Sequence, residues 1–199
     1  MRQVMLAVLV IGLLSLPLMA EDNSKVEVFG GYQYLRLNDV GGCGSSNGCP
    51  NINANGWDAA ATAYFNRFFG VTGDFSGTYN TQSVSVEGIT ASIPLHFYTF
   101  AGGPVVAFRE GKINPFVHAL FGGVHVSASA SAEGASASVS QTGFLTAVGG
   151  GVDVKLNRVI AVRLVDGDWV YYHFSGIFGG PSYSSNGNIR IATGIVLKF

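Results

Sequence analysis

The stretch 189–199, IRIATGIVLKF, decides the fold of this chain. Its residues alternate with a period of two, which is the signature of a β-strand. One face carries apolar side chains such as Ile191 and Leu197, whereas the other face carries Arg190 and Lys198 together with glycine. A strand of a soluble domain would turn its charged face to water. The near-continuous apolar face instead predicts a strand that meets hydrocarbon outside and lines a narrow polar interior.

The composition of the whole chain agrees with that interpretation. Of its 199 residues, 28 are glycine, 48% are hydrophobic and only 12% are charged. Soluble domains carry about 25% charged residues. The formal net charge of −1 gives no basic footprint for nucleic acid. The length suits a single domain.

The first twenty residues read as a secretory signal peptide. Arg2 provides the positive start, residues 4–16 form the apolar core, and the segment before Ala20 is an imperfect small-residue cleavage site. An uncleaved membrane anchor is the alternative, but a spanning helix needs about 20 apolar residues. We therefore expect cleavage near Ala20 and a mature domain over residues 21–199.

Eight alternating or glycine- and aromatic-rich runs follow, and the connections between them differ in length. Four connections are long and polar, and three are short. That order predicts an antiparallel meander with two unlike ends, because outer-membrane barrels have even strand numbers, short turns at one end and longer loops at the other. The expected runs are 25–37, 57–67, 68–77, 92–108, 114–127, 140–155, 158–172 and 188–199, and the long connections are 38–56, 78–91, 128–139 and 173–187.

The third long connection, SASASAEGASASVS, is nearly symmetric about Glu133 and Gly134. If these two residues form a turn, Ser129 faces Ser138, and the same register places large residues opposite small ones further along, as cross-strand packing requires. Four such pairs are Phe116 with Gly151, His118 with Gly149, Leu120 with Ala147 and Phe121 with Thr146. A flexible Ser/Ala linker is the alternative.

Polar residues within the runs identify the interior face. A charge facing lipid near the midplane costs about 2–4 kcal/mol, so we expect these side chains to point inward. The predicted interior residues are Glu27, Asp58, Asp74, His118, Asp153, Arg163, Arg190 and Lys198. Arg163 and Asp166 have opposite parity, and a β-bulge over 164–167 would let both face inward.

We expect the interior charges to pair and to fill the lumen, since eight strands leave room only for side chains. Two pairs of opposite charges fall at matching heights on neighbouring strands: Glu27 with Lys198, and Asp166 or Asp168 with Arg190. A small-solute pore is the alternative. Outward aromatic residues should form two interfacial girdles. The expected members are Trp57, Trp169, Tyr171 and Tyr172 at the loop end, and Phe68, Phe69, Phe108 and Phe199 at the turn end.

These residues resemble the eight-stranded outer-membrane β-barrel family, the OmpA/OmpX/opacity-like group. The resemblance covers the mature chain through VFGGYQYLRL, YTFAGGPVVAFREGKINPFVHALFGG, FLTAVGGGVDVKLNRVIAVRLVDGDWVYYHF and NIRIATGIVLKF. It implies an all-β, eight-stranded, antiparallel up-and-down transmembrane barrel in a Gram-negative-type outer membrane. It also implies that Phe199 is the signal read by the barrel-assembly machinery. The resemblance says little about the function of this chain, because members of the family share a fold and a location rather than an activity.

Two further features bear on chemistry. Cys43 and Cys49 share the first long loop, and outside the inner membrane a loop-closing disulfide is expected, with metal binding or free thiols as alternatives. His173 and Ser175 have the spacing of the pair used by outer-membrane lipid A deacylases, although no acidic partner is evident in that loop.

The sequence therefore favours a non-enzymatic outer-membrane barrel with a plugged lumen and outer loops for surface structure or interaction. A lipid-modifying hydrolase using His173 and Ser175, and a soluble barrel with an apolar ligand site, are the alternatives. We expect no cofactor, no metal and no nucleic acid. The expected partners are outer-membrane lipid and the assembly machinery, and no extracellular partner can be named.

Overall fold

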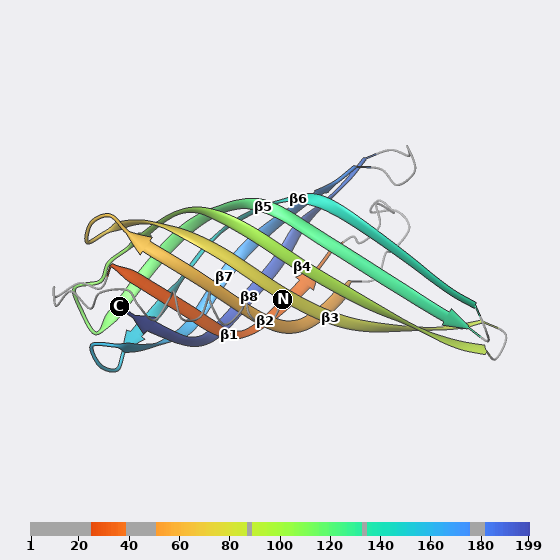
Figure 1. The fold of residues 1–199 in the computed structure, drawn as a ribbon, viewed down its shortest axis with the longest axis horizontal. Helices are drawn as coiled ribbons and strands as arrows, with labels where there is room; N and C mark the ends of the chain where they lie inside the picture. Colours follow the sequence, from red (N-terminus) through yellow and green to blue (C-terminus); the bar gives the residue numbers. More distant parts are fainter. Residues whose placement is uncertain (1–24, 39–50, 87–88, 133–134, 176–181) are drawn as a thin grey trace, which may run out of the picture.

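The structure, a computed structural model, describes residues 25–38, 51–86, 89–132, 135–175 and 182–199. Within these residues eight antiparallel strands close into one barrel, with β1 paired to β8 (Figure 1). The strands are β1 (Val26–Leu37), β2 (Ile52–Tyr64), β3 (Phe69–Val86), β4 (Ile89–Ala107), β5 (Ile113–Ala132), β6 (Ala135–Lys155), β7 (Ile160–Phe174) and β8 (Tyr183–Lys198). The predicted fold class is confirmed. The predicted signal peptide and the two cysteines lie outside the described residues.

Across the same residues we find no helix with the length and apolar character needed to span a membrane. The short connections after β2, β4 and β6 lie together at one end of the barrel, beside the C-terminus, which we call the turn end (Figure 1). The opposite end is the loop end.

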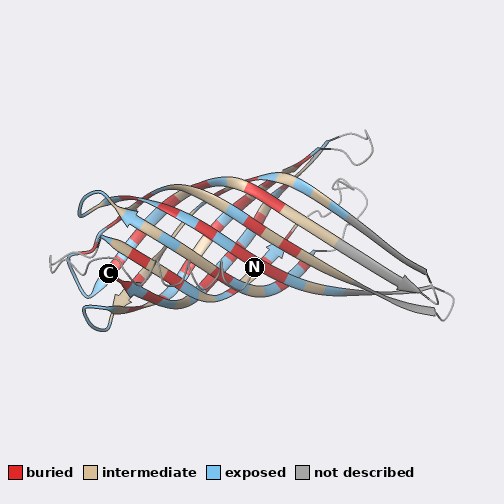
Figure 2. Ribbon diagram, in the orientation of Figure 1, coloured by how far each residue is buried: buried red, intermediate tan, exposed pale blue. Residues whose placement is uncertain are grey.

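Strand β8, which contains most of residues 189–199, has the expected polarity. Ile191 is 43% exposed and Ile195 is 55% exposed, whereas Arg190 is 3% exposed and Lys198 is buried as well. Buried and exposed residues alternate in the same way along the other strands (Figure 2). The barrel therefore turns apolar side chains outward and encloses its charges.

The predicted β5–β6 register is confirmed pair by pair. Ser129 lies opposite Ser138, and toward the turn end His118 lies opposite Gly149 and Phe121 opposite Thr146. The near-symmetric segment is thus a continuation of two paired strands. The alternative of a flexible linker is wrong for the backbone that the structure describes there.

The second connection differs from the prediction. Residues 78–91 were expected to form a long loop, but β3 and β4 continue to the pair Val86 and Ile89. The physical reason is that Ser, Thr and Val alternate through this segment, and paired strands need alternation rather than a high apolar content. The Glu-Gly dipeptide that predicts a hairpin turn at 133–134 also occurs at 87–88. It could have predicted the β3–β4 hairpin in the same way.

A bulge interrupts β7 inside the predicted segment. Val152 of β6 pairs with Val165, but the next pair is Asp153 with Arg163, so Leu164 is the extra residue. Arg163 and Asp166 are consequently both buried. An additional residue on one strand reverses the alternation beyond it.

Closure of the barrel brings β1 and β8 together at two glycines. Gly31 lies opposite Gly194. A Cβ atom built on Gly31 would lie 2.9 Å from the Cα atom of Gly194, closer than real Cβ contacts allow. Phe199 also exchanges two backbone hydrogen bonds with Val26, of 3.2 and 2.8 Å. The seam therefore depends on residues without side chains at its closest point.

Candidate functional site

The lumen is the candidate site, and its centre is an ionic network. Arg190 of β8 contacts Asp74 of β3 at 2.7 Å and Asp168 of β7 at 2.6 Å. Asp168 also forms a 2.6 Å hydrogen bond with Nε2 of His118 on β5. Arg190 and Asp168 are paired residues of neighbouring strands, but β3 is not adjacent to β8 and β5 is not adjacent to β7, so the contacts of Asp74 and His118 cross the interior. The network ties opposite walls of the barrel together.

A second arginine extends the network toward the turn end. Arg163 contacts Asp153 and Asp166, each at 2.9 Å. Its guanidinium carbon lies 4.5 Å from the centre of the Phe29 ring and 4.2 Å from that of Phe116. The guanidinium is therefore held between two aromatic faces and two carboxylates inside the barrel.

A third group of charges lies in the lumen near the turn end. Glu27 lies 3.0 Å from Lys198, as the sequence predicts, and 3.5 Å from Arg109. The Arg109 guanidinium lies 3.7 Å from the centre of the Tyr64 ring. Arg109 follows β4 in the short connection to β5, yet its side chain is buried and folds back into the barrel.

The loop-end half of the lumen contains a large apolar cluster beside buried polar residues such as Thr78 and Asn188, and the sequence did not predict this cluster. Alternation identified the inner face by its charges, yet the same face carries a cluster of buried aliphatic and aromatic side chains. Its members are Leu35, Leu37, Ile52, Ala54, Phe97, Leu120, Val124, Leu145, Ala147, Val170, Tyr172 and Phe174. The predicted girdle position of Tyr172 is therefore wrong, because the bulge in β7 turns this residue inward.

All eight predicted interior residues are buried, and seven of them take part in the contacts described above. Asp58 is the exception. Its Oδ1 atom has no hydrogen-bond partner among the described residues, and no cation there lies within ion-pair distance of it. The lumen thus holds one carboxyl group that the arginines do not reach.

His118, Asp166 and Asp168 place one possible metal-ligand atom each within 4.8 Å of one another. However, Arg163 already binds Asp166, and Arg190 already binds Asp168. Two guanidinium groups beside the carboxylates supply the positive charge that a metal ion would bring. We interpret the cluster as part of the ionic network.

The structure does not bring His173 and Ser175 into a described hydrogen bond. Nδ1 of His173 lies 2.9 Å from the hydroxyl of Ser184, to which Tyr171 also donates a hydrogen bond of 2.9 Å. The carbonyl of Ser175 accepts a hydrogen bond from Gln141. Among the described contacts of His173 there is no carboxylate to orient the imidazole, as acyl transfer by a histidine-activated serine requires.

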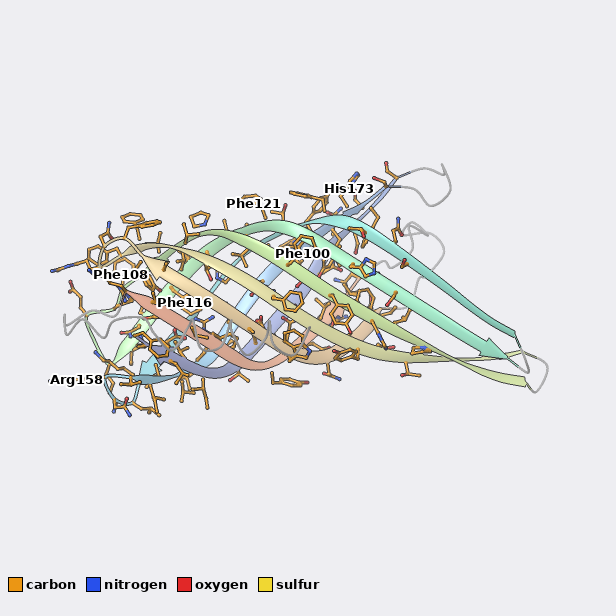
Figure 3. The ribbon with its side chains drawn as sticks, in the orientation of Figure 1. Phe100, Phe108, Phe116, Phe121, Arg158 and His173 are labelled. Atoms are coloured by element: carbon orange, nitrogen blue, oxygen red, sulfur yellow. The ribbon has the colours of Figure 1, made fainter. Side chains whose placement is uncertain are left out.

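The outer surface carries aromatic residues at both ends. At the loop end, Trp57 donates a 3.2 Å hydrogen bond to the hydroxyl of Tyr79, whose ring packs edge-on against Tyr98. At the turn end, the rings of Phe68 and Phe108 lie 5.7 Å apart. Figure 3 labels Phe108 and Arg158 at the turn end and His173 at the other end. Among the described residues no exposed charged side chain lies between these two levels.

Known proteins were compared with this chain at the level of sequence and of structure. No protein-family model matches the sequence, and no curated protein matches it. Solved structures do match. The attachment invasion locus protein Ail of Yersinia pestis is 20% identical, with a TM-score of 0.59 over 89% of this chain and 99% of that chain.

Two further structures match over similar lengths. Neisserial surface protein A is 14% identical, with a TM-score of 0.55 over 88% of this chain and 98% of that chain. The outer membrane protein OprG of Pseudomonas aeruginosa is 11% identical, with a TM-score of 0.51 over 89% and 96%. Together with the closed barrel, these likenesses show that the chain has the fold of the eight-stranded outer-membrane β-barrels.

Proposed function

We propose that this chain is an integral outer-membrane protein, without enzymatic activity, whose plugged barrel carries two projecting β-hairpins and loops for contacts at the cell surface. The observation that carries the location is the polarity of the barrel. Its outside is apolar between two aromatic levels, and its inside holds the charges. A soluble barrel would gain nothing from that arrangement, because exposed apolar surface is unfavourable in water.

The spacing of the aromatic residues supports a membrane-spanning belt. Phe69 and Tyr79 on β3 are ten residues apart, as are Tyr98 and Phe108 on the neighbouring chain segment. At a rise of about 3.3 Å per residue and a strand tilt of about 40°, ten residues climb about 25 Å along the barrel axis. That height equals the apolar band of outer-membrane barrels, about 25 Å.

Two projecting hairpins, formed by the loop-end parts of β3 with β4 and of β5 with β6, support a role at the surface. Pairing of β2 with β3 ends at Tyr79, yet β3 continues to Val86. Pairing of β4 with β5 ends at Leu95 and Ala128, so beyond this point two hairpins run separately (Figure 1). Their backbone edges have no strand partner among the described residues, and such edges are able to pair with an extended segment of another protein.

Location and surface display can be tested together. We expect the chain to fractionate with outer membranes and to migrate differently on gels with and without boiling. An epitope inserted between Glu87 and Gly88 should be labelled on intact cells, whereas the same epitope inserted between Gly111 and Lys112, in a short turn, should be labelled only after permeabilisation. Labelling of the turn-end epitope on intact cells would contradict the proposed orientation.

A plugged lumen predicts little conductance. Insertion of the purified protein into planar bilayers should give no large, steady channels, because Arg163 and the apolar cluster around Leu120 fill successive levels of the interior. The matched variants are Leu120→Ala, which opens space at the loop end, and Leu120→Met, which keeps the volume. Large steady channels from the unaltered protein would show that the lumen is not plugged, and they would favour the small-solute pore.

A further inference from the structure

The three short turns at the turn end share a feature that barrel formation does not require. Each turn carries one exposed cation: Arg67 between β2 and β3, Lys112 between β4 and β5, and Arg158 between β6 and β7. The three residues therefore lie around the same rim, although they are far apart in sequence.

Two of these turns have the same construction. The segments are FNRFF at 65–69 and LNRVI at 156–160. In the first, Oδ1 of Asn66 accepts backbone hydrogen bonds of 2.9 and 2.8 Å from the two residues after Arg67. In the second, Oδ1 of Asn157 accepts bonds of 2.8 and 2.7 Å from the two residues after Arg158. The asparagine fixes the turn, and the arginine at its tip is left to face outward.

Exposed apolar side chains flank each cation. Phe65 is 77% exposed beside Arg67, Ile113 is 65% exposed beside Lys112, and Leu156 is 62% exposed beside Arg158. In water these positions would favour polar residues. A cation beside an exposed apolar residue suits a membrane interface, where the apolar part enters the bilayer and the charge stays at the headgroups.

Neighbouring acids cancel only part of the charge at this rim. Arg67 forms a 2.9 Å ion pair with Glu110, and within the described ranges Lys112 and Arg158 have no acidic partner at ion-pair distance. The loop end is different. There the described residues include one exposed cation, Arg36. The positive charge of the outer surface is therefore concentrated at the turn end.

We propose that the three turn cations form a site for anionic phospholipid headgroups, so that the barrel selects anionic lipid in the leaflet that surrounds its turn end. The inference rests on the proposed membrane location. The chemistry is the attraction of a phosphate-bearing headgroup with net negative charge to Lys and Arg held at the bilayer surface, next to apolar side chains that keep them there. The exposed turn tips act as three separate contacts around the rim.

The test measures lipid selectivity of the inserted protein. The full mature chain is refolded into bilayers of phosphatidylcholine containing spin-labelled phosphatidylglycerol or spin-labelled phosphatidylcholine, and the relative association constant of the two labelled lipids is obtained from their motionally restricted fractions. We expect phosphatidylglycerol to be preferred. Replacing Arg67, Lys112 and Arg158 one at a time by Gln should lower the relative association constant for phosphatidylglycerol. The expected decrease is up to about fivefold in the affinity of the altered turn for the headgroup.

The matched control is Arg36→Gln, which removes an exposed cation from the loop end and should leave the preference unchanged. Raising NaCl to 1 M should weaken the preference, since the screening length falls to about 3 Å. Inorganic phosphate at matched ionic strength should have no effect beyond that of NaCl, because the site takes a headgroup anchored in the bilayer. Displacement by inorganic phosphate would overturn the lipid assignment.

Insertion is measured separately by heat-modifiable migration of the same samples. A chain that inserts but associates equally with both lipids overturns this proposal and leaves the proposed function intact. A chain that does not insert overturns both. A further variant carries all three Gln substitutions, at Arg67, Lys112 and Arg158. If this triple variant and Arg36→Gln lower the preference for phosphatidylglycerol by the same factor, the turn end has no special role and the proposal is wrong.

Discussion

Replacing Arg190 by Met should destabilise the barrel by about 3–5 kcal/mol, the range for removing one partner of a buried ion pair. Arg190 contacts both Asp74 and Asp168 and is 3% exposed. Its removal would leave two buried carboxylates without their shared cation, although Asp168 would keep its hydrogen bond to His118. The free energy of unfolding can be measured by urea titration of the bilayer-inserted protein, with the heat-modifiable gel shift as the readout.

The control for this substitution is Arg67→Met at the turn end. Arg67 is paired with Glu110, but both side chains are more than half exposed, and exposed pairs contribute about 0–1 kcal/mol. Adding Asp74→Asn and Asp168→Asn to Arg190→Met should restore part of the loss, because neutral amides no longer need a cation. Equal effects of Arg190→Met and Arg67→Met would show that the central network does not hold the barrel together.

Replacing Gly31 by Ala should strongly reduce the yield of folded protein, whereas Gly30→Ala should have almost no effect. The two residues are adjacent in β1 but face opposite sides. At Gly31 an added Cβ would meet the backbone of β8, and at Gly30 no heavy atom lies within 4 Å of it. Overpacking costs about 1–3 kcal/mol when side chains can adjust, and here the obstacle is main chain at the seam that closes the barrel.

The folded fraction of the two glycine variants can be compared by refolding each into vesicles under identical conditions. Proteolysis then distinguishes a closed barrel from an open sheet, because strand edges that fail to pair are exposed. If Gly31→Ala folds as well as Gly30→Ala, the approach of β1 to β8 is looser than the structure indicates. The substitution Gly194→Ala probes the same contact from the other strand and should behave like Gly31→Ala.

Alternation along the sequence predicted the number of strands, their facing and the bulge in β7. The serine-rich segment also gave the register of β5 with β6, since a near-symmetric sequence has one best pairing. Contacts between neighbouring strands, such as Glu27 with Lys198, followed from their matching heights. These features are local, or they join strands that are adjacent in the sheet.

Contacts across the lumen could not be predicted in the same way. Arg190 meets Asp74 because strand tilt and stagger bring β8 and β3 to the same height on opposite walls, and alternation says nothing about height. The apolar cluster in the loop-end half of the lumen was not predicted for a related reason. Leu120 and Val170 lie on the inner face identified by charged neighbours, and an inner face was taken to be polar throughout.

The single extra residue in β7 has a consequence for how such a chain can evolve. Leu164 and Val165 both face outward, so the lumen-facing positions of β7 are odd-numbered up to Arg163 and even-numbered from Asp166 onward. Loss of Leu164 would leave Arg163 and Val165 paired with Asp153 and Val152 in a regular ladder, with Asp166 and Asp168 still in the lumen. Loss of one residue between Asp166 and Asp168 would instead turn Asp168 toward the hydrocarbon. Single-residue changes in the length of the spanning part of β7 should therefore be inherited at the bulge, while the turns and the projecting hairpins remain free to vary by one.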